Sequence, residues 1–196
     1  MKVFEFNRWR TIDIVVASVI AVAFGVIFWA WGTVWSITES AFAFFPPAQA
    51  LIYGVWLVPA VLAGLIIRKP GAALYAEAVA ATVSALLGSQ WGVQTVVQGL
   101  VQGLGAELVF AILLYRNFKL PAALLAGAVT GVSAAIYDFI VWNAGTDVWS
   151  YRIPYAAITV VSGAVVAGVG SWALVRALAP TGVLDRFGAG RERASV

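Results

Sequence analysis

The sequence predicts an all-α membrane protein, a bundle of six transmembrane helices with both chain termini in the cytoplasm. Hydrophobic residues make up 62% of the 196 positions and charged residues only 11%. The mean hydropathy is +0.94, whereas a soluble domain of this size needs far more polar surface. The apolar residues form six stretches of near-membrane length, and basic residues gather in the segments between alternate stretches.

Each expected span has its own boundary signals. The first is uncharged from Ile14 to Trp35, which is long enough to cross a hydrocarbon layer of about 30 Å. Pro46 suits the first turn before the second span, and the run 68–71, Arg-Lys-Pro-Gly, ends that span. Glycines at both ends of 88–92 close a short third span. The expected spans are 11–36, 49–67, 72–87, 93–115, 121–142 and 154–178.

This pattern leaves room for one domain. We expect a single integral membrane domain over 1–196, with a cytoplasmic N-terminal segment at 1–11, the six-helix bundle at 12–178 and a polar, mobile cytoplasmic tail at 179–196.

The basic residues fix the orientation. With six spans, only Arg152 falls on the outer side. By the positive-inside rule, the opposite side is the cytoplasm. The basic residues on that side are Lys2, Arg8, Arg10, Arg68, Lys69, Arg116, Lys119, Arg176, Arg186, Arg191 and Arg193.

Several polar side chains lie inside the expected spans, where a charged group costs about 2.5–3.5 kcal/mol at a helix centre. Glu77 and Asp138 each share a helical row with small residues, so we expect both to face the bundle interior and to bind a ligand. Glu107 lies nearer the cytoplasmic end and is expected to be structural. The amide row of the fourth span (Gln94, Gln98 and Gln102) suits either hydrogen bonds between helices or contacts to a ligand.

Aromatic residues gather at the outer ends of the spans. We expect an outer cage in which indoles from three helices surround a ligand beside Asp138. Aromatic faces attract cations and carboxylates accept hydrogen bonds from amino groups, so a flat, amino-bearing, cationic ring compound is favoured. An anionic ligand is disfavoured because only Arg152 lies on that side. The candidate cage residues are Trp31, Trp35, Trp91 and Trp142, with Tyr137 and Asn143 beside them.

What the sequence lacks narrows the function classes. It contains no cysteine and no histidine, which removes thiolate and imidazole ligands and the usual nucleophiles and bases. We therefore expect no enzyme, no metal site and no cofactor. There is no P-loop motif, so active uptake would need a separate ATPase. A small channel or a structural membrane subunit without a tight ligand remains the alternative from a different class.

The first span carries a row of small residues that could contact another helix or a partner protein. Ala17, Ala21 and Gly25 recur every fourth residue, a spacing that lets another membrane helix approach closely. The row suits packing within the bundle as well as contact with a partner protein.

The run 9–32, WRTIDIVVASVIAVAFGVIFWAWG, resembles the YkoE family of substrate-binding S components of energy-coupling-factor (ECF) vitamin transporters. Similarity extends to the LYAE stretch around Glu77, the glutamine-rich fourth span and Tyr137-Asp138. The resemblance implies an S component in the bacterial cytoplasmic membrane. It would bind thiamine outside and work with a transmembrane coupling protein (T component) and ABC-type ATPases.

The resemblance also implies roles for particular residues. Glu77 would pair with the aminopyrimidine of thiamine and Asp138 would offset its thiazolium charge. Ala17, Ala21 and Gly25 would contact the coupling protein. The precursor hydroxymethylpyrimidine, phosphorylated thiamine or another vitamin such as riboflavin remain alternative ligands.

Overall fold

The computed structural model describes residues 8–191, which form helices and short connections with no β-strand in that range. Lys2, Arg193 and the outermost parts of the two terminal segments lie outside the described residues. The helices are α1 (Thr11–Thr38), α2 (Val58–Ile67), α3 (Ala72–Leu86), α4 (Gln94–Ile112), α5 (Leu120–Val141), α6 (Ile153–Ser162), α7 (Gly170–Leu178) and α8 (Gly188–Arg191). Three segments are 3₁₀ helices, namely η1 (Glu39–Phe42), η2 (Pro46–Leu57) and η5 (Ala179–Thr181). Two are π-helices, namely η3 (Val148–Arg152) and η4 (Gly163–Val169).

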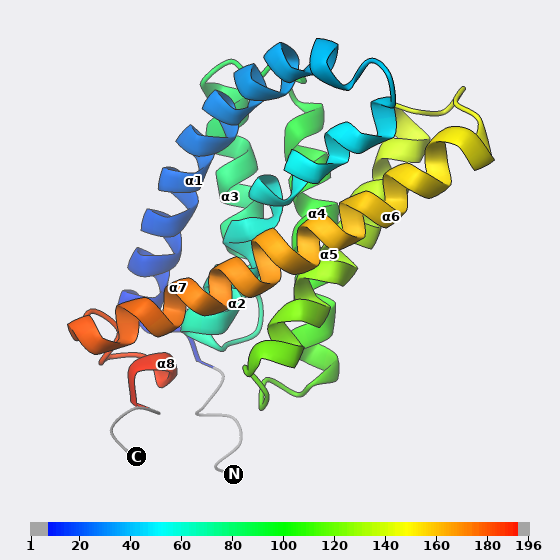
Figure 1. Cartoon of the computed structure of the whole chain (residues 1–196). Helices are drawn as coiled ribbons and strands as arrows, with labels where there is room; N and C mark the ends of the chain where they lie inside the picture. The colour runs from blue at the N-terminus through cyan, green and yellow to red at the C-terminus, as the bar shows by residue number, and fades with distance from the viewer. Residues whose placement is uncertain (1–7, 192–196) are drawn as a thin grey trace.

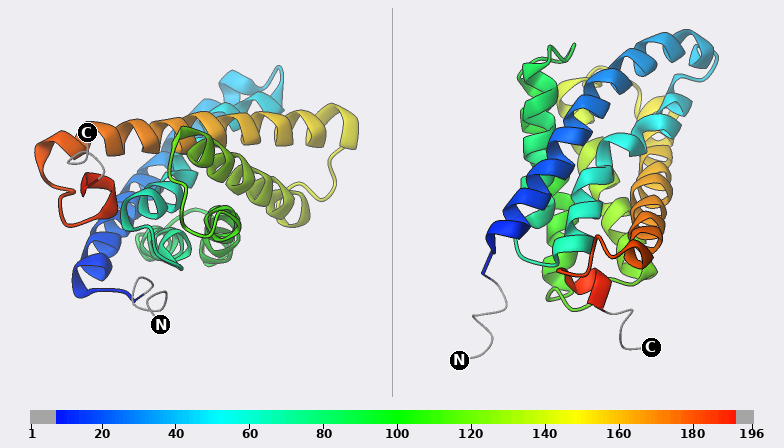
Figure 2. Two further views of the ribbon diagram at one scale, coloured as in Figure 1. Left: turned by 90° about the horizontal axis from the view of Figure 1, so that it is seen from below. Right: turned by 90° about the vertical axis from the view of Figure 1, so that its left-hand side faces the viewer.

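These elements make the six expected spans. Within residues 8–191, five helical stretches are long and apolar enough to cross a membrane, and α3 is a shorter apolar helix. The second span joins η2 to α2, and the sixth runs without a break from η3 to α7. Both ends of the described chain lie at the same end of the bundle, and the sixth span crosses the other helices obliquely (Figures 1 and 2). The all-α bundle predicted from the sequence is confirmed.

The second span differs from the expected continuous α-helix. Its outer half, η2, is a 3₁₀ helix of 12 residues, much longer than the usual three or four. The hydroxyl of Ser162 explains part of this geometry, since it accepts a hydrogen bond from Gly54 N (2.9 Å) and donates one to Leu51 O (2.7 Å). This side chain from α6 therefore supports the backbone of η2 from the side.

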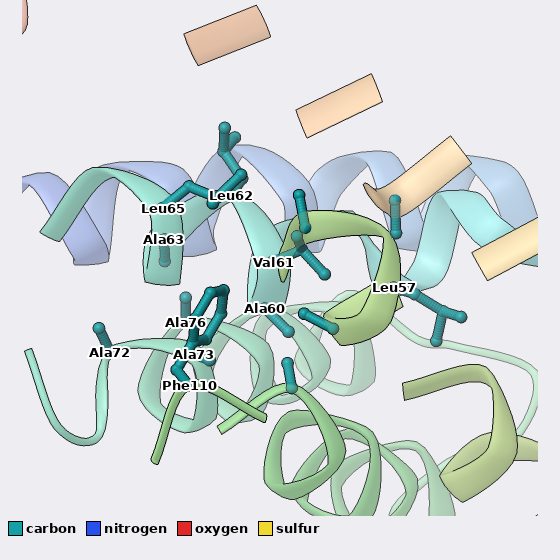
Figure 3. Packing of buried hydrophobic residues seen from close by; sticks show 14 of the residues in the cluster. Leu57, Ala60, Val61, Leu62, Ala63, Leu65, Ala72, Ala73, Ala76 and Phe110 are labelled. Carbon is teal, nitrogen blue, oxygen red and sulfur yellow. The ribbon is translucent and has the colours of Figure 1, made fainter. Parts of the chain in front are cut away.

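Helix α2 is the centre of the core. Residues 59–67 are all buried, as expected for a helix that is apolar all round. Phe110 from α4 lies against this helix at Gly64, where no β-carbon would fit beside its ring. Figure 3 shows Phe110 together with alanines of α3, including Ala73 and Ala76, next to α2.

Ion pairs centred on Asp13 stabilise the end of the bundle that carries the termini. Asp13 is fully buried and lies 2.8 Å from the Arg10 guanidinium and 2.5 Å from Lys69 Nζ. The tail does not project as a free polar segment, because Leu184 and Phe187 are buried in the core cluster. The Arg10 guanidinium also lies 5.8 Å from the centre of the Phe187 ring. The described part of the tail is thus packed onto the bundle, in contrast to the mobile tail expected from its composition.

Candidate functional site

A cavity of about 260 Å³ lies at the end of the bundle opposite the termini. Its volume is close to the lower limit of small-molecule pockets, about 300–1,000 Å³. All six spans and the outer connections contribute side chains. The lining residues are Phe28, Trp35, Glu39, Gln49, Tyr53, Trp56, Ala81, Ser84, Ser89, Trp91, Thr95, Gln98, Gln102, Asp138, Trp142, Asn143, Tyr151 and Tyr155.

Asp138 is the centre of a hydrogen-bond network in this cavity. Its Oδ2 accepts a hydrogen bond from Tyr155 Oη at 2.6 Å, and its Oδ1 accepts one from Gln98 Nε2 at 2.8 Å. The same Gln98 nitrogen donates to Tyr53 Oη at 2.5 Å, and Gln102 Nε2 also donates there at 3.0 Å. Asp138 is only 2% exposed, so its carboxyl is held in a fixed position by neutral donors.

The cavity has an excess of acidic groups. Glu39 and Asp138 line it, and no lysine or arginine does so among residues 8–191. Arg152, the basic residue of the outer side, is engaged elsewhere. It donates to the carbonyls of Asn143 (3.0 Å) and Ala144 and lies over the Phe139 ring. Because a buried carboxylate without a counter-charge is costly, this site favours a cationic or amino-bearing ligand.

Aromatic rings form a continuous wall around the carboxyl. The Trp56 ring lies 5.4 Å from Trp91, 5.2 Å from Trp35 and 5.4 Å from Tyr53, measured between ring centres. Tyr53 continues the wall to Tyr155 at 6.4 Å. Electron-rich faces of this kind attract cations and stack on flat rings.

Three further acids, the buried Asp13 and Glu77 and the half-buried Glu107, have backbone partners. Glu107 accepts hydrogen bonds from Gly71 N (2.6 Å) and Ala73 N (3.0 Å) at the start of α3. Glu77 Oε2 accepts one from Ala60 N (3.0 Å) in the first turn of α2. Asp13 accepts one from the backbone N–H of its own N-cap residue. Each carboxyl thus satisfies amides that a helix start leaves unpaired.

Six of the predicted site residues line the cavity. They are Trp35, Trp91, Gln98, Asp138, Trp142 and Asn143.

Four other predicted site residues do not line the cavity. Glu77 is fully buried one helical turn below Ala81, and its Oε1 has no hydrogen-bond partner among the described residues. Tyr137 Oη donates to Gln94 Oε1 at 2.7 Å, so these two side chains satisfy each other. Trp31 turns away, and its Nε1 donates to Ile52 O at 2.9 Å. Glu77 lies outside the cavity because the helix row that carries it reaches the cavity only at Ala81 and Ser84.

The small-residue row of α1 also has a different neighbour from the one that the resemblance implied. Ala17 and Ala21 are fully buried inside the chain. A β-carbon at Gly25 would lie 2.5 Å from Val83 Cβ of α3. The row therefore packs α1 against α3, and it is not available at the surface for a partner.

Sequence reasoning missed the residues that complete the wall. Tyr53, Trp56 and Tyr155 were not selected, although Tyr53 and Trp56 are three residues apart and so share one face of the 3₁₀ helix η2. That spacing was the available signal. Gln102 was identified as part of the amide row and does line the cavity beside Tyr53.

Comparison with known proteins gives three matches. A family model described as an ABC-type cobalt transport system, permease component, matches residues 12–133. A protein of Bacillus subtilis (strain 168), whose description names it provisionally as the HMP/thiamine permease YkoE, is 38% identical over 186 residues. That alignment covers 95% of this chain and 92% of the relative. A solved structure described as an S-component of an ECF transporter superposes with a TM-score of 0.90 at 37% identity, covering 96% of this chain and 94% of the other.

Proposed function

Because this chain belongs to the YkoE family of S components of ECF transporters, we propose that it captures thiamine in the outer cavity. S components are multi-pass proteins of the bacterial cytoplasmic membrane and are not enzymes. Family membership implies that the chain works with a transmembrane coupling protein and with ABC-type ATPases, which would supply the energy.

One observation carries the choice of ligand: a buried carboxyl, Asp138, faces a cavity that contains no basic residue among residues 8–191. Thiamine combines an aminopyrimidine with a permanently positive thiazolium ring. In our proposal the cation or the amino group lies against Asp138, whose position is fixed by Tyr155 and Gln98. The flat rings stack against the aromatic wall formed by Trp35, Trp56 and Trp91.

The precursor hydroxymethylpyrimidine is the alternative ligand, and the relative from Bacillus subtilis is named for both compounds. It shares the aminopyrimidine but lacks the fixed positive charge. Glu39 supports thiamine, because a second carboxyl in the lining adds electrostatic attraction for a permanent cation.

A cobalt ion, as in the description of the matching family model, fits the cavity less well. Within residues 8–191, no three His, Cys, Asp or Glu side chains gather to hold a metal ion. Divalent cobalt binds well to imidazole and other nitrogen donors, and histidine does not occur in the sequence.

Isothermal titration of the purified chain with thiamine, hydroxymethylpyrimidine and Co²⁺ tests the proposal. We expect saturable binding of thiamine, and a loss of at least about tenfold in affinity for Asp138→Asn, since this change removes a buried charge. Two variants serve as matched controls. Asp147→Asn alters an exposed acid in the outer connection between α5 and η3, and Glu77→Gln alters the buried acid outside the cavity. Both should keep thiamine affinity within about twofold of the unmodified chain.

The result separates the alternatives. Tight binding of hydroxymethylpyrimidine with none of thiamine would assign the precursor as ligand. Binding of Co²⁺ alone would contradict the whole proposal. Unchanged thiamine affinity in Asp138→Asn would place the ligand elsewhere.

A further inference from the structure

A second cavity lies at the opposite end of the bundle, where the chain termini are. Its volume is about 740 Å³, and it lies between the ends of α2 and α7, the start of α5, and α8. It shares no residue with the outer cavity. Its lining residues are Leu65, Arg68, Phe118, Lys119, Leu120, Pro121, Trp172, Val175, Arg176, Ala179, Pro180 and Ala189.

This lining is divided between cations and apolar side chains. Arg68, Lys119 and Arg176 supply positive charge, and no acidic residue lines the cavity among residues 8–191. Lys119 and Arg176 are exposed and form no ion pair within that range. Positive charge gathered in a hollow attracts the opposite charge, so the chemistry of this lining suits an anion.

Two of the cations are held in place by aromatic rings. The Arg68 guanidinium lies 4.6 Å from the centre of the Phe118 ring, and the Arg176 guanidinium lies 4.8 Å from that of Trp172. A guanidinium over a ring still presents N–H groups at its edge, which match phosphate oxygens.

The apolar half of the lining points to the kind of anion. Leucine, proline, valine and tryptophan side chains stand beside the cations, as at the level of lipid headgroups, where Trp and basic residues are common. The cytoplasmic leaflet carries anionic lipids, and basic pockets between transmembrane helices on that side bind their headgroups. A free phosphate would use the cations but leave the apolar wall uncovered.

We propose that this cavity binds an anionic phospholipid of the inner leaflet, with its phosphate at Lys119 and Arg176 and its acyl chains along Leu120 and Trp172. The bound lipid joins α2, α5 and α7 at the cytoplasmic surface. This proposal does not depend on which vitamin the outer cavity takes.

The test uses the full chain, purified in detergent, delipidated and then titrated with phosphatidylglycerol, phosphatidylcholine or inorganic phosphate. Native mass spectrometry counts retained lipid, and the melting temperature reports stabilisation. Lys119→Gln/Arg176→Gln removes two cavity charges. Arg8→Gln/Arg116→Gln removes two exposed charges at the same end but outside the cavity.

We expect phosphatidylglycerol to be retained and to raise the melting temperature more than phosphatidylcholine does. The cavity variant should bind it at least about tenfold more weakly, while the control variant keeps its affinity within about threefold. Equal retention of phosphatidylcholine, or equal loss in both variants, would overturn the proposal. So would full stabilisation by inorganic phosphate alone. Failure of the cavity variant to join the coupling protein, with lipid retention unchanged, would assign the cavity to that protein instead.

Discussion

Gly25→Ala tests how closely α1 packs against α3. The new β-carbon would lie 2.5 Å from Val83 Cβ and 2.9 Å from the backbone oxygen of Ala80. Neither atom is the free end of a flexible side chain, so α1 must move outward. Overpacking of this kind costs about 1–3 kcal/mol, and the better helix propensity of alanine returns about 0.5–1 kcal/mol. From the middle of both ranges, the net loss of stability is about 1 kcal/mol.

Thermal unfolding of the purified chain measures this loss. At about 2–4 °C per kcal/mol for a chain of this size, we expect a melting temperature lower by about 2–4 °C. Thiamine affinity should also fall, because α1 and α3 both contribute to the outer cavity. Ala23→Val on the exposed face of α1 is the matched control, with a change within about 0.5 kcal/mol. An unchanged melting temperature in Gly25→Ala, together with failure to bind the coupling protein, would refute this reasoning. It would indicate that the small-residue row of α1 contacts the coupling protein instead of α3.

Two further substitutions test the aromatic wall and the helix start of α3. Trp56→Leu should weaken thiamine binding by about 3- to 30-fold through loss of ring contacts, whereas Trp149→Leu, at an 80% exposed tryptophan, should leave it unchanged in the same titration. Equal effects of the two would argue against the wall. Glu107→Ala should lower the free energy of unfolding by about 2–4 kcal/mol, because Gly71 N and Ala73 N lose their acceptor. Thiamine binding by the folded fraction should persist, and its disappearance without a change in melting temperature would give Glu107 a role in binding.

The spans were predictable because apolar length and charge placement are properties of short segments. The boundaries of α3 and α5 lie within one residue of those expected. The second span departs further, since η2 begins at Pro46 and has 3₁₀ geometry. The hydroxyl that supports this geometry belongs to Ser162, more than one hundred residues along the chain. The sequence of the second span alone therefore cannot reveal the hydrogen-bond partner that supports its 3₁₀ geometry.

Asp138 and Gln98, which were selected because polar groups are costly to bury in a membrane, both line the outer cavity. The same reasoning did not place Glu77, which lies outside the cavity, because a carboxyl can satisfy a backbone amide as well as a ligand. Its partner is Ala60 N, and backbone donors at a helix start are not visible as residue types. Amino-acid identity could show that these acids avoid lipid, but only the packing of α2, α3 and α4 decides what each one faces.

A similar limit applied to the tryptophans. Trp31 was expected in the outer cage and Trp56 was not selected, but of these two only Trp56 lines the cavity. Trp31 instead donates its Nε1 proton to Ile52 O. The difference depends on how α1 and η2 are rotated about their axes, which tertiary packing sets.

The outer cavity has a solid base. One helical turn nearer the termini, beneath Ala81, Gln102, Asp138 and Tyr155, the corresponding positions are Glu77, Ala106, Ala134 and Thr159, and all are fully buried. A captured molecule therefore rests in a cup, not at the entrance of a pore. Delivery to the cytoplasm requires either that this base separate or that the whole subunit swing its mouth across the bilayer. Between such events the chain can hold its cargo without making the membrane leak.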